Sequence, residues 1–376
     1  MFIGTMKLNL FKSHTFTHTK QNIFDTQQRN FLRTPLYYVV ILLLIVIVNG
    51  CSNSANNPDS QRQAVNKIQK HVTSKNLYGV EAFGDKYAWV VGEEGTIFHT
   101  SDKGENWETQ KSPVNFDLYE ASFVDSNTGW IVGKRGTILH TTDGGNLWTV
   151  QETNTKERLF AVHFIDKNKG WAVGTMTTIM NTVDGGHTWV NQGPGEDRYL
   201  NGVLFINDRI GWVVGEYNTI YHTTNGGKQW VLQECEVLIP EEPEKDFPPP
   251  PPHLFGIYFL NQSVGCVASM DGIIVRTEDG GIVWEKIETS ARFTFFNIAM
   301  VKNMGWAVGE RGQFCKTTDS GKSWKMEKDV IKTRFWLRDI DFPDIKNGWI
   351  VGAFGTILHT EDSGRTWDMI SGISIQ

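Results

Sequence analysis

The fold is decided by one stretch of sequence, residues 129–148, which reads GWIVGKRGTILHTTDGGNLW. Recognisable copies of this stretch recur to the C-terminus, and each copy closes on a tryptophan. The closing tryptophans are Trp107, Trp148, Trp189, Trp230, Trp284, Trp324 and Trp367. They are spaced 41, 41, 41, 54, 40 and 43 residues apart. Seven copies at one period predict a repeat architecture, and the single long step indicates an insertion in one copy.

Each repeat unit has the pattern of four short strands. In the second unit these are residues 118–124, 129–133, 137–142 and 148–152, each bounded by Gly, Asp or Asn. Runs of about five residues with such turns are typical of β-strands. Four short antiparallel strands per unit, repeated seven times, are what radial packing of blades requires. We therefore expect an all-β fold, a seven-bladed β-propeller of four-stranded antiparallel blades, over residues 65–376.

The residues that recur in every unit have structural roles in this interpretation. We expect the glycines in the turn at 132–136 to take positive φ, and Asp143 to bond the backbone of its own turn. The tryptophans of each unit are expected to pack against the neighbouring blade, with the indole N–H finding a partner. One register of the third strand holds His99, His140, His222 and His359. Equivalent positions are separated around a propeller, so we expect no metal site and no cofactor.

The closing turn of the unit matches a known pattern. Its Thr-x-Asp-x-Gly-x-x-Trp resembles the Asp-box turn of sialidases and related propellers. Copies contain Asp102, Asp143, Asp184, Asp279, Asp319 and Asp362, with Asn225 in the fourth unit. Taken with the preceding Gly-Trp-x-Val-Gly-x-x-Gly-Thr-Ile-x-His-Thr, the unit resembles the photosystem II assembly and stability factors of cyanobacteria and chloroplasts, and their relatives in non-photosynthetic bacteria. This resemblance, over about residues 66–376, implies a non-enzymatic protein that binds a membrane-complex subunit during assembly.

An enzymatic alternative stays open, because sialidases also carry Asp boxes. Catalysis in that family would require three convergent arginines, a nucleophilic tyrosine and a glutamate partner. No Arg-Ile-Pro motif precedes the first repeats, and no distinctive Tyr–Glu pairing is present. A surface glycan-binding propeller or a sialidase-like glycoside hydrolase is therefore the alternative, and we predict no catalytic residue.

Function is expected in the loops, where the copies differ. In a propeller, the loops between blades and the turns between second and third strands emerge on one face. The loops between blades contribute Arg158, Arg198, Arg292 and Arg334, and the turns add Lys134, Arg135 and Arg311. We expect a partner-binding surface here, since arginine grips carboxylates in a bidentate manner and the resembling factors carry an arginine-rich patch. Acidic residues in the same turns, such as Glu93 and Asp271, leave ordinary loop charge as the alternative.

The long step in the period comes from an insertion at 236–253. It contains five consecutive prolines, residues 248–252, which favour an extended polyproline II segment. The insertion is either a recognition arm or a stiff acidic spur on the same face as the arginines. The formal net charge of −6 argues against nucleic acid as the partner and leaves another protein.

The N-terminus predicts export. Basic residues precede an apolar run at 37–48, which suits a secretory signal but is too short to span a bilayer as a helix. The sequence Val48-Asn49-Gly50-Cys51 resembles a bacterial lipobox, in which cleavage leaves a lipid on the cysteine. We expect a signal peptide at 1–50, a tether at 51–64 and a monomeric propeller. It would be lipid-anchored through Cys51 to a cell-envelope membrane, on its periplasmic or outer side. An uncleaved anchor is the alternative.

Two smaller expectations concern the propeller itself. Cys235, Cys266 and Cys315 are scattered and odd in number, which indicates core positions with at most one pair rather than a disulfide framework. The ring can close in two ways, because residues 66–73 and residues 367–373 can each supply the outer strand of the last blade.

Overall fold

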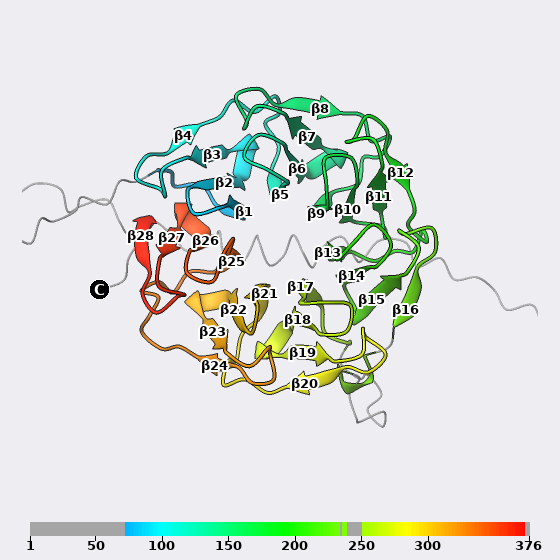
Figure 1. Ribbon diagram of the computed structural model, residues 1–376, viewed down its shortest axis with the longest axis vertical. Coiled ribbons are helices and arrows are strands. Elements are labelled where there is room, and N and C mark those ends of the chain that lie inside the picture. The colour runs from blue at the N-terminus through cyan, green and yellow to red at the C-terminus, as the bar shows by residue number, and fades with distance from the viewer. Residues whose placement is uncertain (1–71, 234, 239–249, 373–376) are drawn as a thin grey trace, which may run out of the picture. The chain divides into compact units, whose positions relative to one another are not determined.

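Seven four-stranded antiparallel sheets surround a central axis in the computed structural model, which describes residues 72–233, 235–238 and 250–372 (Figure 1). Each sheet is built from four consecutive strands, in the same order in space as along the chain. The first strand of each blade lies nearest the axis and the fourth lies at the rim (Figure 1). The expected all-β, seven-bladed propeller is confirmed.

The blades follow one another along the chain. Blade 1 contains β1 (Leu77–Phe83), β2 (Tyr87–Gly92), β3 (Ile97–Thr100) and β4 (Glu108–Thr109). Blade 2 contains β5 (Leu118–Phe123), β6 (Gly129–Gly133), β7 (Ile138–Thr141) and β8 (Thr149–Gln151). Blade 3 contains β9 (Leu159–Phe164), β10 (Gly170–Gly174), β11 (Ile179–Thr182) and β12 (Val190–Asn191). Blade 4 contains β13 (Leu200–Phe205), β14 (Gly211–Gly215), β15 (Thr219–Thr223) and β16 (Val231–Gln233).

The remaining blades and the short 3-10 turns complete the ring. Blade 5 contains β17 (Leu254–Phe259), β18 (Gly265–Ser269), β19 (Ile274–Thr277) and β20 (Glu285–Ile287). Blade 6 contains β21 (Phe295–Val301), β22 (Met304–Gly309), β23 (Phe314–Thr317) and β24 (Lys325–Met326). Blade 7 contains β25 (Leu337–Asp341), β26 (Gly348–Gly352), β27 (Ile357–Thr360) and β28 (Asp368–Ser371). The 3-10 turns are η1 (Glu93–Gly95), η2 (Lys134–Gly136), η3 (Glu236–Leu238), η4 (Met270–Gly272), η5 (Glu310–Gly312) and η6 (Ala353–Gly355).

The core lies between the blades rather than at one centre. Side chains alternate across a strand, so each second strand contacts both neighbouring blades. In β6, Ile131 packs in the cluster shared with blade 1, whereas Trp130 and Val132 pack in the cluster shared with blade 3. All five residues of β6 are buried for this reason.

In six of the blades, a tryptophan of the second strand packs against the next blade, as expected. The indole of Trp130 stacks on Phe164 of blade 3, with 3.5 Å between ring centroids. Its Nε1 donates a hydrogen bond to the carbonyl oxygen of Gly185, at 3.1 Å. The same stack and bond recur at Trp89, Trp171, Trp212 and Trp306. An aromatic pair of this kind adds about 0.5–1.5 kcal/mol to the burial of its area.

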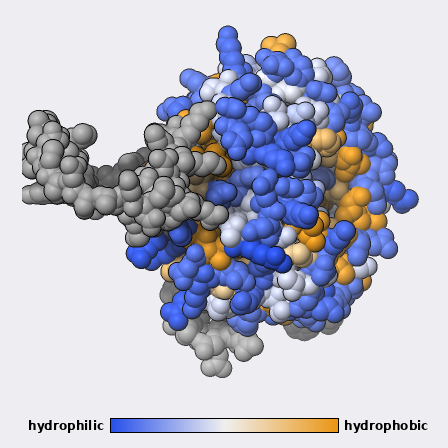
Figure 2. All heavy atoms as spheres, turned by 60° about the vertical axis from the view of Figure 1, so that its left-hand side comes forward, coloured by the Kyte–Doolittle hydropathy of each residue, from blue (hydrophilic) through white to orange (hydrophobic). Residues whose placement is uncertain are grey.

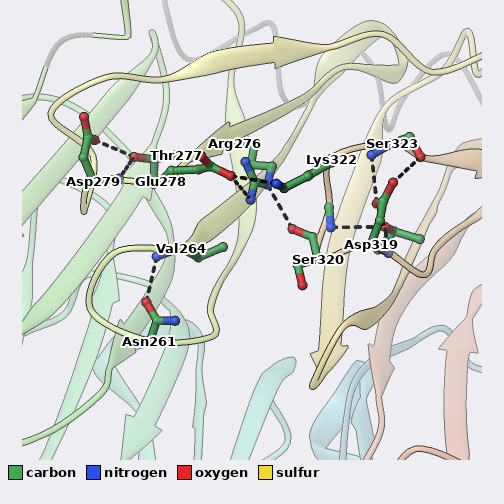
Figure 3. Close-up of polar contacts among 12 residues, drawn as sticks. Asn261, Val264, Arg276, Thr277, Glu278, Asp279, Asp319, Ser320, Lys322 and Ser323 are labelled. Atoms are coloured by element: carbon green, nitrogen blue, oxygen red, sulfur yellow. Dashed lines mark hydrogen bonds and ion pairs between the residues drawn. The ribbon is translucent and has the colours of Figure 1, made fainter.

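Blade 5 is joined to blade 6 in another way, because Cys266 stands where the other blades have tryptophan. The cross-strand neighbour of Cys266 is Arg276, whose side chain is only 4% exposed. Its Nε donates to the carbonyl oxygen of Ser320 in blade 6 at 2.9 Å, and its Nη2 lies 2.8 Å from Glu278 (Figure 3). The arginine therefore supplies the interblade hydrogen bond that the indole supplies elsewhere. The histidines of the same register instead stack on their own tryptophans, as His140 does on Trp130.

The recurring turns follow the expected chemistry with one difference. Thr141 Oγ1 donates to Asp143 Oδ1 at 2.8 Å, and that oxygen also accepts the Leu147 N–H at 3.0 Å. Gly136 takes a φ of +69°, as predicted. Gly133 has a φ of −166°, so it does not need positive φ. Glycine is required at 133 because a Cβ there would lie 2.4 Å from the Asp117 carbonyl oxygen.

The ring closes without exchange of a strand among the described residues. The fourth strand of blade 7 is β28, from the C-terminal segment, and it pairs with β27. The N–H of Val72 donates to Ser371 Oγ at 3.1 Å, and the N–H of Ala82 donates to Asp341 Oδ2 at 2.8 Å. Of residues 66–73, proposed as an alternative strand, 66–71 lie outside the described part of the chain, and residues 72 and 73 are not in a strand.

The three cysteines of the propeller are core positions, as predicted. Cys235, Cys266 and Cys315 are buried and unpaired. Burial raises the pKa of each thiol to about 12. The predicted signal peptide, the tether with Cys51 and most of the insertion lie outside the described residues. Within the described ranges, no helix is both long enough and apolar enough to cross a membrane.

Candidate protein-binding face

The loops between blades and the turns between second and third strands share one face of the propeller. The N–H of Lys134, in the turn after β6, donates to the carbonyl oxygen of Asp117, in the loop before β5. The turns between third and fourth strands lie at the other face, where the Gly144 N–H donates to the Asn127 carbonyl oxygen. We call the first of these the channel-mouth face.

All seven predicted cations lie in loops and turns of the channel-mouth face, but not in one register. Arg158 directly precedes β9, Arg198 lies two residues before β13, and Arg292 and Arg334 lie three residues before β21 and β25. The exposed members of the set are Arg135, Arg158, Arg292, Arg311 and Arg334. They therefore meet the solvent at different points around the ring.

Two of the predicted cations have partners within the face. Arg198 Nε lies 3.0 Å from Glu196 Oε2, and its Nη1 donates to Thr219 Oγ1 at 2.8 Å. Lys134 Nζ lies 3.9 Å from Asp117 Oδ2. Their charges are partly compensated, so the five exposed arginines carry the remaining charge of the predicted set.

Arg135 and Arg311 are held in position by aromatic rings. Each guanidinium carbon lies 4.5 Å from a ring centroid, that of Phe116 for Arg135 and that of Phe293 for Arg311. Both arginines occupy the left-handed turn position, with φ of +62° and +56°. Cation–π stacking limits the conformations of a long side chain, so less entropy is lost when it binds an anion.

A group that the sequence interpretation missed surrounds the axis at this face. The second residue of each inner strand contributes to it: Tyr78, Tyr119, Phe160, Asn201, Phe255, Phe296 and Arg338. We call these seven residues the axial collar. The ring of Tyr119 lies 5.6 Å from that of Tyr78 and 5.4 Å from that of Phe160. Arg338 lies over the ring of Phe296 at 5.2 Å. The sequence does contain a signal for these residues, because the residue type at this position changes between repeats, from Tyr to Asn to Arg.

Buried carboxyl groups follow the collar along the axis. Glu120 Oε2 accepts the N–H of Val162, at 3.1 Å, and Asp339 Oδ2 accepts the N–H of Val80, at 2.7 Å. Each acceptor thus reaches the inner strand of the next blade, whose edge has no further strand to satisfy its N–H groups. Burial raises the pKa of Glu120 well above its ordinary value. These carboxyl groups therefore join neighbouring inner strands by hydrogen bonds.

Cavities lie at the two ends of the axis. The collar and the residues below it enclose about 60 Å³. A larger hollow of about 810 Å³ opens near the ends of β13 and β17 and is lined by His163, Leu204, Tyr258 and Gln262 among others. No carboxyl group is among its described lining residues. Burial lowers the pKa of His163, whose Nε2 lies 3.0 Å from the Phe205 carbonyl oxygen.

The side of the propeller formed by blades 7 and 1 is mainly polar. Figure 2 shows this side, where hydrophilic residues cover most of the visible surface and hydrophobic ones form small separate patches. Contacts on this side would therefore be made chiefly by polar and charged groups.

Comparisons with known proteins agree with this architecture. The family model described as photosynthesis system II assembly factor YCF48 matches residues 57–159, 145–246 and 251–328. A solved structure of YCF48 bound to D1 peptide is 20% identical, with a TM-score of 0.63 over 78% of this chain and 95% of its own. YCF48 from Cyanidioschyzon merolae is 18% identical, with a TM-score of 0.63 over 78% of this chain and 98% of its own.

More distant propellers share the fold alone. An ancestral GH74 enzyme is 13% identical, with a TM-score of 0.62 over 79% of this chain and 46% of its own. No curated protein matches the sequence. Since the family model covers more than half of the chain, the protein belongs to the family of the photosynthesis system II assembly factor YCF48.

Proposed function

We propose that this protein is a non-enzymatic binding protein whose channel-mouth face holds a segment of another protein. The observation that carries the proposal is the set of exposed arginines, two of them braced by aromatic rings, around the axial collar. Arginine forks and aromatic rings are typical of surfaces that bind protein. One of the related structures is of YCF48 bound to D1 peptide, which supports a polypeptide as the partner.

The class of partner follows from the charges and the family. Guanidinium groups pair best with carboxylates, so an acidic and extended segment fits this face. Family membership supports a subunit of a membrane complex, held during its assembly. In a photosynthetic organism, this complex is photosystem II.

The buried acids support binding rather than catalysis. A glycoside hydrolase needs two carboxyl groups that flank a sugar, one as acid and one as base or nucleophile. Glu120 and Asp339 instead accept backbone N–H groups of neighbouring blades. The cavity beside them, about 60 Å³, is well below the roughly 300–1,000 Å³ of small-molecule sites.

Charge reversal on the channel-mouth face tests the proposal. The variant carries Glu in place of Arg135, Arg158, Arg292 and Arg334. We expect crosslinking to the partner in membranes to fall roughly tenfold or more, because attraction for an acidic segment becomes repulsion. The yield of crosslinked partner, identified by mass spectrometry, is the measurement.

The matched control reverses four exposed cations on the opposite face. It carries Glu in place of Arg209, Lys228, Lys346 and Arg365, in loops after inner strands and turns after third strands. The net charge changes equally in both variants, so a general charge effect would lower both yields. Equal yields from both variants would overturn the assignment of the face.

We propose that a lipid on Cys51 tethers the propeller to a membrane of the cell envelope. The lipobox-like sequence before Cys51 and the polar segment after it support this role. Labelled palmitate should enter the wild-type protein and not Cys51→Ala, since the thiol is the predicted site of attachment. Equal labelling of the two proteins would exclude Cys51.

A further inference from the structure

Arg338 is a cation of the axial collar that forms no ion pair with another described residue. Among the described residues, no hydrogen bond or ion pair reaches its guanidinium, which lies 5.2 Å from the centroid of the Phe296 ring. The side chain is half-buried and lines the axial cavity. A desolvated charge in a folded protein ordinarily has a partner, so this group requires an explanation.

The nearest acids direct their oxygens elsewhere. Asp339 Oδ2 accepts the Val80 N–H at 2.7 Å, and its Oδ1 accepts the Ile340 N–H at 2.8 Å. Asp339 Oδ1 also accepts from the Asn297 side-chain amide. Glu120 accepts the Val162 N–H and holds its proton more readily than usual, because burial raises its pKa. The charges of Asp339 and Glu120 favour the charged form of Arg338, but neither acid forms an ion pair with it. The five donors of the guanidinium therefore remain available for hydrogen bonds.

Space for a ligand lies within the same cavity. Blades 4 and 5 carry Gly202 and Gly256 in the register where blades 2 and 7 carry Glu120 and Asp339. The glycines contribute no side chain to the cavity of about 60 Å³, which all seven inner strands line. This volume admits one small group and excludes a whole metabolite of ordinary size.

We infer that Arg338 binds a single carboxylate, which the axial cavity receives from the polypeptide held on the channel-mouth face. The planar guanidinium matches a planar carboxylate through two parallel hydrogen bonds. A phosphate group is larger and carries more charge beside Glu120 and Asp339, so the site favours the carboxylate. That the carboxylate belongs to a polypeptide rests on the function proposed above, whereas the carboxylate site itself does not.

Small probes test the site on the full-length protein. N-acetylalanine presents a chain-terminal carboxylate, N-acetylaspartic acid α-amide presents a side-chain carboxylate, and N-acetylalanine amide is the neutral control. Isothermal titration and saturation-transfer NMR should detect one or both acids with a dissociation constant on the order of millimolar. Arg338→Met should weaken binding at least tenfold, and Arg338→Lys should weaken it too because lysine lacks the fork. Arg365→Met, in an exposed turn of the opposite face, should bind as the wild type does.

The stability of Arg338→Met separates a binding role from a structural one. An unpaired cation contributes little to the fold, so the midpoint of thermal unfolding without probe should stay the same or rise. A clear fall in that midpoint would overturn the inference, as would equal probe binding by wild type and Arg338→Met, or equal binding of the neutral amide. If Arg338→Met lost probe binding but still crosslinked to the partner as the wild type does, the carboxylate would have no role in capture of the partner. Probe binding with no partner at the channel-mouth face would instead contradict the proposed function.

Discussion

We expect Trp130→Ala to lower the free energy of unfolding by about 3–5 kcal/mol, as large aromatic truncations in cores do. Trp130 is fully buried, stacks on Phe164 and bonds to the Gly185 carbonyl oxygen. Its removal leaves a cavity between blades 2 and 3 that the strands cannot close. Urea unfolding followed by tryptophan fluorescence and circular dichroism measures the change.

Two further variants divide this effect into its parts. Trp130→Phe keeps an aromatic ring but loses the N–H, and Gly185 retains the hydrogen bond that Gln151 donates at 2.9 Å. We expect this change to cost less than the alanine variant. Val150→Ala, at a side chain 54% exposed, should change stability by less than about 0.5 kcal/mol. A loss at Trp130→Ala no larger than at Val150→Ala would contradict the interblade role of the tryptophan.

We also expect the propeller to lose stability as the pH rises from about 4 to 7, in part through Asp341. Burial, helped by the charge of Asp339, raises the folded-state pKa of Asp341 to about 7 from an ordinary value of 3.8. A raised folded-state pKa means that the protonated form favours folding. The contribution is therefore complete below pH 4 and is lost as the pH approaches 7.

Asp341→Asn should remove this part of the pH dependence. In the wild type, the Ala82 N–H donates to the Asp341 carboxylate at 2.8 Å, and the amide oxygen of Asn can still accept this bond. The variant buries no charge at high pH. We expect a gain of about 2–4 kcal/mol over the wild type at pH 8 and little difference near pH 4. Urea unfolding at both pH values provides the measurement. A variant less stable than the wild type at pH 8 would contradict the assignment.

Asp143→Asn is the matched control for this experiment. Hydrogen bonding to the Leu147 N–H lowers the pKa of Asp143, the reverse of the shift at Asp341. The fourth repeat naturally has Asn225 in this position, where its Oδ1 accepts the Gln229 N–H at 2.9 Å. The control should therefore fold and should gain no stability at pH 8.

Much of the scaffold was predictable because it repeats. Counterparts of Trp130, Gly136 and Asp143 occur in other units, and a structural role that recurs in this way can be inferred from the spacing of the residues alone. Strand length, blade number and the packing of tryptophan between blades all followed from that spacing. The exchange of Trp for Cys266 was visible, but its compensation by Arg276 depends on cross-strand pairing that the sequence does not display.

The centre of the candidate site was not predictable in the same way. The axial collar combines residues about one repeat apart that meet only when the ring is closed. Tyr119 and Arg338 each look like an ordinary strand residue beside a buried leucine. The surrounding arginines were predictable because function is expected where the repeats differ, and the loops differ. The inner strands also differ at the register of Arg338, so the same criterion would have identified it.

The role of the channel-mouth face is tested most directly by placing a photo-crosslinking amino acid on each face in turn. One protein carries benzoylphenylalanine in place of Arg158, on the channel-mouth face, and another carries it in place of Arg365, on the opposite face. Both positions are exposed, so the probe can reach a bound protein from either. After irradiation of membranes, the partner should be joined to the protein with the probe at 158 and not to the one with the probe at 365. Adducts at 365 alone, or in equal yield at both positions, would contradict binding through the channel-mouth face.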